Sequence, residues 1–539
     1  MQSFFQKKSV FVFFYIVTLI FYFPSRYAGF LTDFIGFEAA YNKCGFIHYY
    51  DCSLMPNLRY VQHLFSYLLC KTVGAGTIYW YILYCFFHAL SAYLGYLVVK
   101  RLLTTYSIEN DGKIAFASAI LFLISPYQAE VVVWRVCIQY CFVSIALSLN
   151  ILILLSYLTE QKIWKPLLAF LIFGISIFSL EQAAAIPISL LVIAVIINRN
   201  KYILKKSIAL FVVPQVLFVG FYFLLSKLMY HKWIMHYGAA TFEHILSFKT
   251  YSKFFSYCFK YLFLLRFIEN EELKEKAFSM ISQPWFIVCL SILVFYVLSR
   301  LIKNSLQQNS KSGLYLIFIS LYIITMLPVI QLYDSTLLLS ENDRLGYVSS
   351  LFIFTCLSVF LLDKKKKILN LLLGIILFAN AYFLLKIVHY WNISNNIAYS
   401  FANNFNYYDK NEIIILGIPD NYKGIWMLRA DNSALKEFIK FKLHKEIHAS
   451  IDEVADYNQT AYEDGVNVKK ENDSTLYVSF KQYGNWWWKG GLGMTDYENA
   501  KYKMTTDEWS GYHLIIKNIQ SHNYTIIYPD SLQWKQFIF

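Results

Sequence analysis

Charged side chains are scarce in this 539-residue sequence. Asp, Glu, Lys and Arg make up 15% of the residues, against about 25% in an average soluble domain, and hydrophobic residues make up 57%. This composition excludes a soluble globular protein, a disordered chain, a collagen and a small disulfide-rich secreted domain. The sequence also lacks a P-loop, a paired Cys-x-x-Cys motif and a His-Glu-x-x-His motif, which removes the commonest nucleotide and zinc sites.

The hydrophobic residues form about eleven runs long enough to cross a bilayer, which takes roughly 17–25 mainly apolar residues. We expect spans at 9–25, 77–99, 114–131, 137–158, 166–180, 184–198, 207–229, 284–300, 313–332, 347–362 and 368–388. The first run ends in Pro24-Ser25-Arg26 without a small-residue cleavage pattern, which indicates an uncleaved span.

The basic residues indicate how the spans are oriented. The net charge of +13 comes mostly from short loops between the apolar runs. Six basic clusters fall on one side: Lys7/Lys8, Lys100/Arg101/Lys113, Lys162/Lys165, 199–206, Arg300/Lys303/Lys311 and 364–367. Because Lys and Arg are enriched in cytoplasmic loops, this agreement predicts a cytoplasmic N-terminus. The outer side then carries the loops 26–76, 132–136, 181–183, 230–283 and 333–346 and the chain after about 390.

The segment 254–268 bears on this assignment of loops to the two sides of the membrane. It is apolar and aromatic, but Lys260 and Arg266 interrupt it. A further span here would move the basic cluster at 364–367 to the outer side. We therefore expect an amphipathic helix lying along the membrane surface.

The C-terminal part of the chain has a different composition. Short strand-like runs at 413–418, 477–480, 513–519 and 524–528 and a helical stretch at 434–443 predict a small α+β domain. The expected fold is therefore an α-helical polytopic membrane protein of about eleven spans, residues 1–398, followed by an extracytoplasmic α+β domain, residues 399–539. Adjacent tryptophans at 486–488 cannot all face one core, so they either stack on sugar, lie at the membrane interface or pack in part against a sheet.

Most of the nine cysteines lie inside spans, where a thiol behaves as a small hydrophobic group. Cys44 and Cys52 lie in the first outer loop and are either a disulfide or two free thiols. The richness in Lys, Ile, Asn, Phe and Tyr hints at an AT-rich bacterial genome. We therefore expect a multi-pass protein of the bacterial cytoplasmic membrane, with its C-terminal domain in the periplasm.

Ionisable residues close to the spans collect on the outer side. These residues are Asp33 in the first loop, Glu130 and Arg135 at the end of the third span, Glu181 at an outer turn, and Glu341, Asp343 and Arg344 before the tenth span. Such groups cost about 2.5–3.5 kcal/mol at the bilayer centre, so each needs a reason. Structural reasons stay open for several of them: Glu130 pairing with Arg135 or capping a re-entrant turn, a helix-dipole role for Glu181, an interfacial Arg344 and a helix-capping Asp33. His88, on an apolar face, is either a packing residue or a ligand.

Several short blocks resemble those of the GT-C glycosyltransferases related to the transmembrane-and-TPR O-mannosyltransferases. The block 125–131 through Arg135 resembles their P-x-x-x-E-x-V block, and 179–182 up to Pro187 is similar to S-K-E…P. Met326-Leu327-Pro328 with 341–349 resembles L-P…E-R-x-x-Y-x-P-S. Asn57-Leu58-Arg59-Tyr60 lies where the family has Y-R-P-L, and Phe87-His88-Ala89-Leu90 matches L-H-A-L.

The sequence departs from this pattern at several points. The acidic pair of the family's first outer loop is a single Asp33 here, with Glu38 five positions later. Leu180, Ser349 and Tyr60 replace the family's Lys, Pro and Pro. No TPR repeats follow, so the acceptor of the TPR members is not carried over.

The resemblance implies transfer of a sugar from a polyprenyl-phosphate donor to a protein or glycan acceptor on the extracytoplasmic face, with inversion. Asp33 would be the general base. Arg344, Arg135, Arg59 and Tyr347 would bind the donor phosphate. The expected orienting or substrate-binding residues are Glu38, Glu130, Glu181 and His88. No metal cofactor and no nucleic acid partner are expected.

Two other functions stay open. One is a polymerase or ligase for a surface polysaccharide, which keeps the enzyme class. The other is a flippase or transporter of lipid-linked sugar, which predicts polar residues through the full membrane depth and broken helices near the midplane. The acidic residues collect at one face instead, which favours an enzyme.

Overall fold

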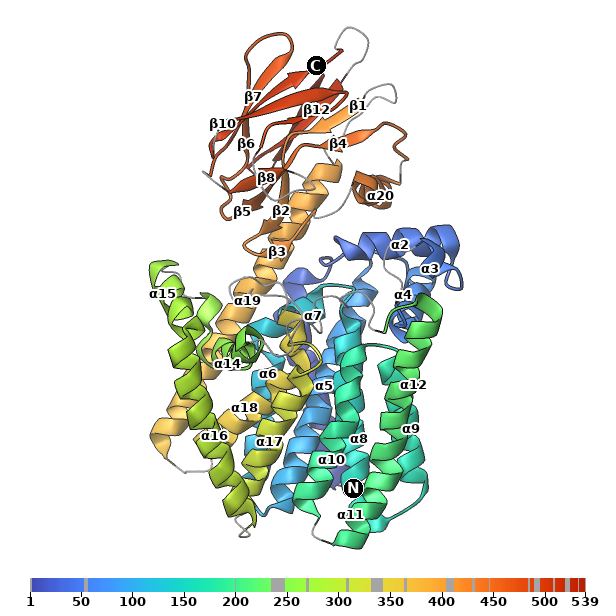
Figure 1. Cartoon of the computed structure of the whole chain (residues 1–539), viewed down its shortest axis with the longest axis vertical. Coiled ribbons are helices and arrows are strands. Elements are labelled where there is room, and N and C mark those ends of the chain that lie inside the picture. The colour runs from blue at the N-terminus through green and yellow to red at the C-terminus, as the bar shows by residue number, and fades with distance from the viewer. Residues whose placement is uncertain are drawn as a thin grey trace. The chain divides into compact units, whose positions relative to one another are not determined.

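The computed structural model describes residues 2–52, 57–198, 200–233, 248–267, 271–306, 310–330, 343–362, 366–403, 412–428, 432–444, 446–482, 485–488, 495–507, 509–518, 524–531 and 533–538. The chain forms two compact units (Figure 1). The first unit comprises Met1–Arg26 and Phe46–Val388 and is helical. The second comprises Tyr27–Gly45 and His389–Phe539 and contains the strands.

Apolar helices dominate the first unit. Its helices are α1 (Gln2–Tyr22), α3 (Tyr49–Cys52), α4 (Tyr60–Thr72), α5 (Ile78–Thr105), α6 (Asp111–Leu123), α7 (Ala129–Val133), α8 (Ile138–Glu160), α9 (Trp164–Ile177), α10 (Ala185–Ile197), α11 (Lys201–Ser207), α12 (Val213–Tyr230), α14 (Phe248–Phe263), α15 (Glu271–Ser282), α16 (Pro284–Leu306), α17 (Ser310–Met326) and α18 (Tyr347–Leu362). Helix α19 (Lys367–Asn403) begins in this unit and ends in the second.

Six helices among the described residues are long and apolar enough to cross a membrane, or seven if the bent pair Asp111–Leu123 and Pro126–Val133 is one span. The six are Ile78–Thr105, Ile138–Glu160, Lys201–Tyr230, Pro284–Asn304, Asp343–Leu362 and Lys367–Asn403. Four further predicted spans coincide with shorter apolar helices, Ser9–Ser25, Trp164–Ile177, Glu181–Ile197 and Lys311–Met326. Helices that are long and apolar enough to cross a membrane are therefore present, and the count of eleven spans stays a prediction.

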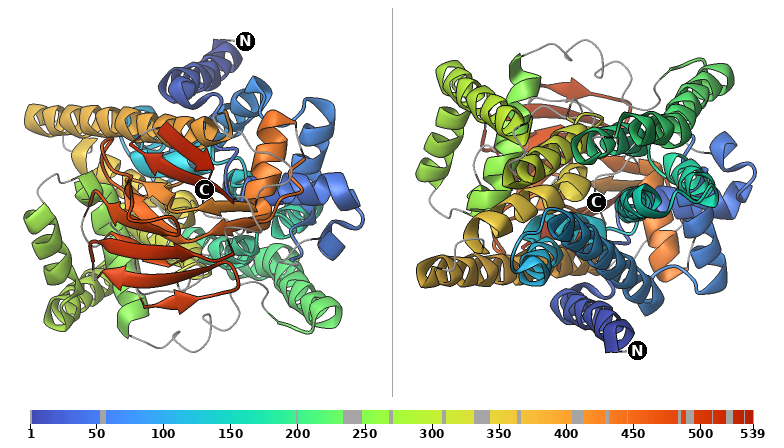
Figure 2. Two further views of the ribbon diagram at one scale, coloured as in Figure 1. Left: turned by 90° about the horizontal axis from the view of Figure 1, so that it is seen from above. Right: turned by 90° about the horizontal axis from the view of Figure 1, so that it is seen from below.

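Helices α5, α6, α8 and α18 form the buried centre of the first unit. Helix α18 packs against α6, α8 and α17, and α5 packs against α6 and α8. Gly95 allows the close approach of α5 to α18, because a Cβ atom there would lie 2.7 Å from Leu351. Helix α1 lies at the edge of this unit in both views of Figure 2, and Ile20 on it is exposed. This exposure suits a surface that faces lipid.

The segment predicted to lie along the membrane surface, 254–268, overlaps α14 (Phe248–Phe263). Figure 1 shows α14 running across the direction of α16 and α17. One side of α14 buries Ser256, Lys260 and Tyr261, whereas Phe263 is exposed. The predicted helix is therefore present, and its place at the membrane surface stays a prediction.

The second unit is rich in strands, as the sequence predicted. Its described strands form three sheets with the orders β13-β12-β1-β4, β6-β7-β11-β10-β9 and β3-β2-β5-β8. The strands are β1 (Glu412–Ile415), β2 (Ile418–Tyr422), β3 (Ile425–Trp426), β4 (Ile451–Glu453), β5 (Ala455–Gln459), β6 (Val466–Lys470), β7 (Thr475–Phe480), β8 (Trp486–Trp488), β9 (Tyr497–Glu498), β10 (Tyr502–Asp507), β11 (Gly511–Ile516), β12 (Tyr524–Asp530) and β13 (Gln533–Ile538). The unit also contains α2 (Asp33–Cys44) and α20 (Asn432–Leu443).

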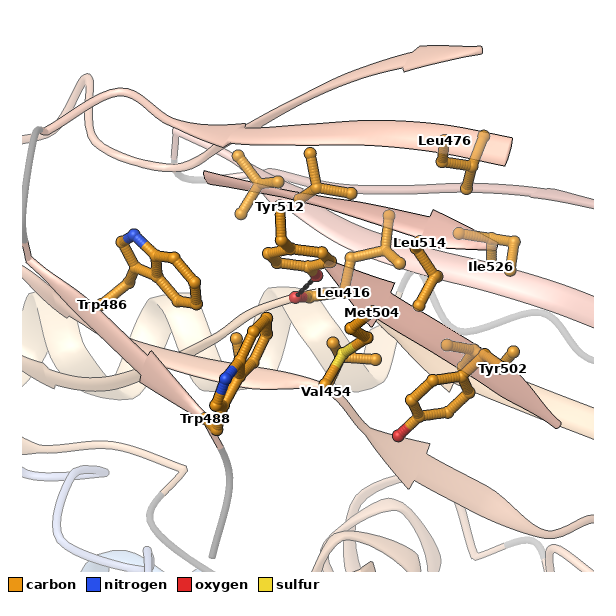
Figure 3. Packing of buried hydrophobic residues seen from close by; sticks show 14 of the residues in the cluster. Leu416, Val454, Leu476, Trp486, Trp488, Tyr502, Met504, Tyr512, Leu514 and Ile526 are labelled. Atoms are coloured by element: carbon orange, nitrogen blue, oxygen red, sulfur yellow. Dashed lines mark hydrogen bonds between the residues drawn. The ribbon is translucent and has the colours of Figure 1, made fainter. Parts of the chain in front are cut away.

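The tryptophan run lies on β8, where side chains alternate between the two faces. Trp486 and Trp488 are 2% and 8% exposed, and Trp487 is half-buried. Figure 3 shows Trp486 and Trp488 beside Tyr512 in the core, and the Trp486 ring centroid lies 5.0 Å from that of Phe480. Two of the three tryptophans therefore pack in the core.

The cysteines differ by location. Cys44 and Cys52 are disulfide-bonded, whereas the other seven cysteines are free thiols. The sequence had left both states open for the two loop cysteines. A disulfide there suits an oxidising compartment.

We expect Trp486→Ala to destabilise the second unit by about 3–5 kcal/mol, because it leaves a large cavity in the core. Trp487→Ala is the matched control and should cost much less, because its side chain is half-buried. Thermal unfolding of the purified full-length protein, with limited proteolysis to follow residues after 403, measures both. Equal losses for the two variants would contradict this account of the core.

Candidate functional site

The chain bends after α6, and this bend places the Glu130 side chain in the interior of the first unit. The two segments Asp111–Leu123 and Pro126–Val133 are bent by 55°, and a proline at the start of the second segment cannot continue a helix. The Glu130 carboxylate is buried and accepts a hydrogen bond from the backbone N–H of Arg344 at 2.7 Å. It also forms a salt bridge with the Arg344 guanidinium. Glu130 therefore fixes both the backbone and the side chain of Arg344.

The Arg344 guanidinium has a second contact on the same segment as Glu130. Its central carbon lies 5.1 Å from the centroid of the Trp134 ring, which is a cation–π distance. The Arg344 side chain is 12% exposed, whereas that of Glu130 is 2% exposed. The arginine is thus held on two sides and keeps part of its surface accessible.

Asp343 extends this arrangement to the amphipathic helix. Its buried carboxylate forms salt bridges with Lys260 of α14 and with Arg266 of the short helix Leu265–Phe267. Both cations also lie 5.1 Å from the centroid of the Tyr127 ring. Among the described residues, the cluster therefore joins three cations and two carboxylates, from Glu130, Lys260, Arg266, Asp343 and Arg344.

Lys260 and Arg266 were not among the predicted site residues. The sequence did contain a signal, because these two charges interrupt an otherwise apolar and aromatic segment. Their pairing with Asp343 could not be read from spacing, since Asp343 lies 77 residues beyond Arg266.

Arg59 and Glu181 form a separate ion pair. The Arg59 guanidinium lies 3.0 Å from Glu181 Oε2, and the Tyr222 hydroxyl donates to Glu181 Oε1 at 3.1 Å. Their side chains are 19% and 24% exposed, more than those of Glu130 and Arg344. The structure thus brings together two predicted residues from the first outer loop and the later outer turn.

Arg135 has a different environment. Its guanidinium is fully buried and donates to the carbonyl oxygens of Val132 at 2.7 Å and Ser25 at 3.3 Å. It also lies 5.1 Å from the centroid of the Tyr84 ring. These contacts connect the bend after α6 with the short helix Phe23–Ser25 that follows α1. The ion-pair partner of Glu130 is Arg344.

His88 and Tyr347 lie in the buried centre. The His88 Nδ1 atom is 2.7 Å from the Tyr347 hydroxyl, and Nε2 is 3.1 Å from the Leu123 carbonyl oxygen. Both side chains are fully buried. The contacts link α5, α18 and the end of α6, which agrees with the alternative reading of His88 as a packing residue.

Asp33 and Glu38 belong to the second unit. Asp33 is the first residue of α2 and is exposed, in a position where a carboxylate is stabilised by the helix dipole. Glu38 lies in the middle of α2 and accepts a hydrogen bond from Asn42 on the next turn. The two acidic residues predicted in the first loop therefore share one helix.

Metal ligands are not gathered in the described part of the chain. No group of three or more His, Cys, Asp or Glu side chains there could hold a metal ion.

Comparison with known proteins finds a likeness among solved structures alone. No protein-family model matches the sequence, and no curated protein matches it. Among solved structures the chain is similar to ArnT from Cupriavidus metallidurans bound to undecaprenyl phosphate, with 13% identity and a TM-score of 0.35. The likeness covers 82% of this chain and 89% of that chain.

Gly346 offers a test of how the charge cluster is assembled. A Cβ atom at this position would overlap the Tyr261 hydroxyl of α14 and lie 2.8 Å from its Cζ atom. We expect Gly346→Ala to cost about 1–3 kcal/mol, because the Tyr261 ring must move. Adding Tyr261→Phe should restore part of the loss. Thermal unfolding in detergent measures these variants.

Gly374→Ala is the matched control, because no atom lies within 4 Å of a Cβ at that position. A Gly346→Ala variant as stable as Gly374→Ala would contradict the close packing of α14 on the turn before α18.

Proposed function

We propose that this chain is an integral membrane glycosyltransferase of GT-C type that uses a polyprenyl-phosphate-linked sugar. The observation that carries the proposal is the fixing of Arg344 by Glu130, with Lys260 and Arg266 in the same cluster. Arginine suits a phosphate because its planar guanidinium can donate two parallel hydrogen bonds. The partly accessible Arg344 is the member that would contact the phosphate, and the buried members would orient it.

The apolar helices of the first unit suit a lipid-linked donor. An isoprenoid chain needs a hydrocarbon environment, whereas its phosphate needs cations at the edge of that environment. The cluster lies at helix ends, at the break after α6 and at the turn before α18. This combination supports a donor whose lipid lies among the helices and whose phosphate meets Arg344.

In the proposed reaction, the Asp33 carboxylate takes the proton from an acceptor hydroxyl as its oxygen attacks the anomeric carbon. The bond between that carbon and the phosphate oxygen breaks, and its electron pair leaves with the lipid phosphate. Arg344 stabilises the charge that develops there. A single displacement of this kind inverts the anomeric centre. The acceptor would be a protein hydroxyl or a glycan on the periplasmic side, and no step requires a metal.

The alternatives differ in how they use the same residues. A polysaccharide polymerase or ligase would use the same cluster with a glycan acceptor. A transporter would need polar groups through the depth of the bilayer. The charged cluster instead lies at helix ends, which favours transfer at one face.

Asp33→Asn tests the proposed base. The substitution keeps the size of the side chain and removes its ability to accept a proton. We expect transfer from a labelled polyprenyl-phosphate sugar to a crude envelope acceptor mixture to fall about 10²-fold or more, as is usual for a general base. Label in protein or in glycan identifies the acceptor class. Equal transfer by the variant would exclude Asp33 as the base, and donor binding without any transfer would favour a transporter.

Arg344→Gln tests the phosphate site. Loss of a charge-assisted hydrogen bond of about 1.5–3 kcal/mol predicts donor binding weaker by about 10–150-fold. Arg344→Lys should retain part of the affinity, because it keeps the charge but not the planar fork. Binding of the labelled donor to the purified protein measures both.

Arg101→Gln is the matched control for the arginine variants. Arg101 is exposed near the end of α5, in a predicted cytoplasmic cluster, and we expect its replacement to leave donor binding unchanged. Weakening of the same size in Arg101→Gln and Arg344→Gln would show that general positive charge, and not Arg344, binds the donor.

A further inference from the structure

The helix that carries Asp33 belongs to the same compact unit as the C-terminal domain. Residues Tyr27–Gly45 group with His389–Phe539, although hundreds of residues separate them in the sequence. Within this unit, α2 packs against α20. The domain therefore supplies the surface on which the predicted catalytic segment folds.

Aromatic rings form the contact between α2 and α20. The Phe441 ring centroid of α20 lies 6.5 Å from that of Phe30 and 6.2 Å from that of Phe34. Phe30 and Phe34 also pack on each other, with centroids 5.0 Å apart. Both are almost fully buried, at 0% and 2% exposed. Such aromatic contacts stabilise beyond the area that they bury.

Asp33 lies between these two anchored rings in the sequence. Phe34 follows it directly, and Phe30 precedes it by three residues. Asp33 itself is exposed at the first position of α2. Burial of Phe30 and Phe34 anchors the chain three residues before and one residue after Asp33.

Other residues of α20 anchor it within the domain. Leu435, Phe438 and Ile439 are buried at helical spacing. The Phe438 ring packs on Tyr399 of α19, and the Lys442 ammonium lies 3.2 Å from the centroid of the same Tyr399 ring. Helix α20 is therefore held within the domain while Phe441 contacts the α2 segment.

Electrostatic attraction also favours the contact between α20 and α2. The hydrogen bond to Glu446 raises the pKa of Lys440 on α20, and the charge of Glu38 on α2 raises it further. Lys440 is solvent-exposed, so this attraction is weak and screened by salt. The aromatic contact is the stronger link.

We infer that Phe441 is a positioning residue for Asp33, so that the C-terminal domain sets the geometry of the proposed general base. This inference rests on the proposed function for its catalytic consequence. Misplacing a catalytic group by about 1 Å can cost 10²-fold in rate. Loss of the aromatic contact should therefore lower the rate of transfer without weakening donor binding.

The first measurement is kinetic and uses the full-length protein. We expect Phe441→Ala to lower kcat for sugar transfer about tenfold or more, and to leave KM for the lipid donor within about twofold of the wild type. Phe441→Leu should lose less, because it keeps an apolar side chain in the contact. Tyr462→Ala is the matched control: this aromatic residue lies in the same domain, is 42% exposed and packs on Tyr422 of β2.

A double-mutant cycle separates positioning from general destabilisation. If Phe441 acts through Asp33, adding Phe441→Ala to Asp33→Asn should cause no further loss of kcat. If the two losses multiply, the inference is overturned. Should Phe441→Ala reduce the amount of folded protein, Phe441→Leu takes its place in the same cycle.

Hydrogen exchange tests the inference without any activity. We expect Phe441→Ala to speed amide exchange across Asp33–Cys44, and Tyr462→Ala to leave it unchanged. Unchanged exchange in Phe441→Ala overturns the inference. Faster exchange in a protein whose wild type transfers no sugar supports the mechanical link and rejects the proposed function, so the two failures are distinguishable.

Discussion

The buried ion pair between Glu130 and Arg344 is the interaction on which the candidate site depends. It joins residues 214 positions apart, and it holds both the backbone and the guanidinium of Arg344. Because Asp343 is the neighbouring residue, the turn that Glu130 fixes also presents the carboxylate that binds Lys260 and Arg266. The break after α6, the turn before α18 and the amphipathic α14 are thus fastened at one point.

A cluster of buried charges is a poor way to gain stability. Removing charges from water costs several kcal/mol per ion, and well-packed apolar residues of similar volume often stabilise a protein more. The first unit already has an extensive apolar core around α5, α6, α8 and α18. Three cations face two carboxylates in this cluster, which leaves one excess positive charge. That excess suits the negatively charged phosphate of the proposed donor.

The sequence predicted the parts of this protein that depend on local patterns. Apolar runs predicted membrane helices, and strand-like runs with a helix at 434–443 predicted the strand-rich domain. The Glu130–Arg344 contact could not be predicted from local pattern, because the sequence offered Arg135 as a nearer partner for Glu130. The place of Lys260 and Arg266 was equally hidden, since their charges only marked the segment as unsuited to a span. At 486–488, alternation predicted divided faces, but only the tertiary core determined that Trp486 and Trp488 would be the buried pair.

The points at which the sequence departs from the resembled family are distributed unevenly between the two compact units. The blocks at 125–135 and 343–349 lie in the first unit, which contains the proposed phosphate site. The two largest departures are the single Asp33 in place of an acidic pair and a strand-rich domain in place of TPR repeats, and both lie in the second unit. Smaller departures, at Tyr60, Leu180 and Ser349, lie within the blocks of the first unit. A donor that is common to many enzymes constrains the residues that bind it, whereas the acceptor differs from one enzyme to the next. Because α2 packs against α20, the segment around Asp33 and the C-terminal domain are structurally coupled in this chain, and the two departures fall on the two sides of one contact.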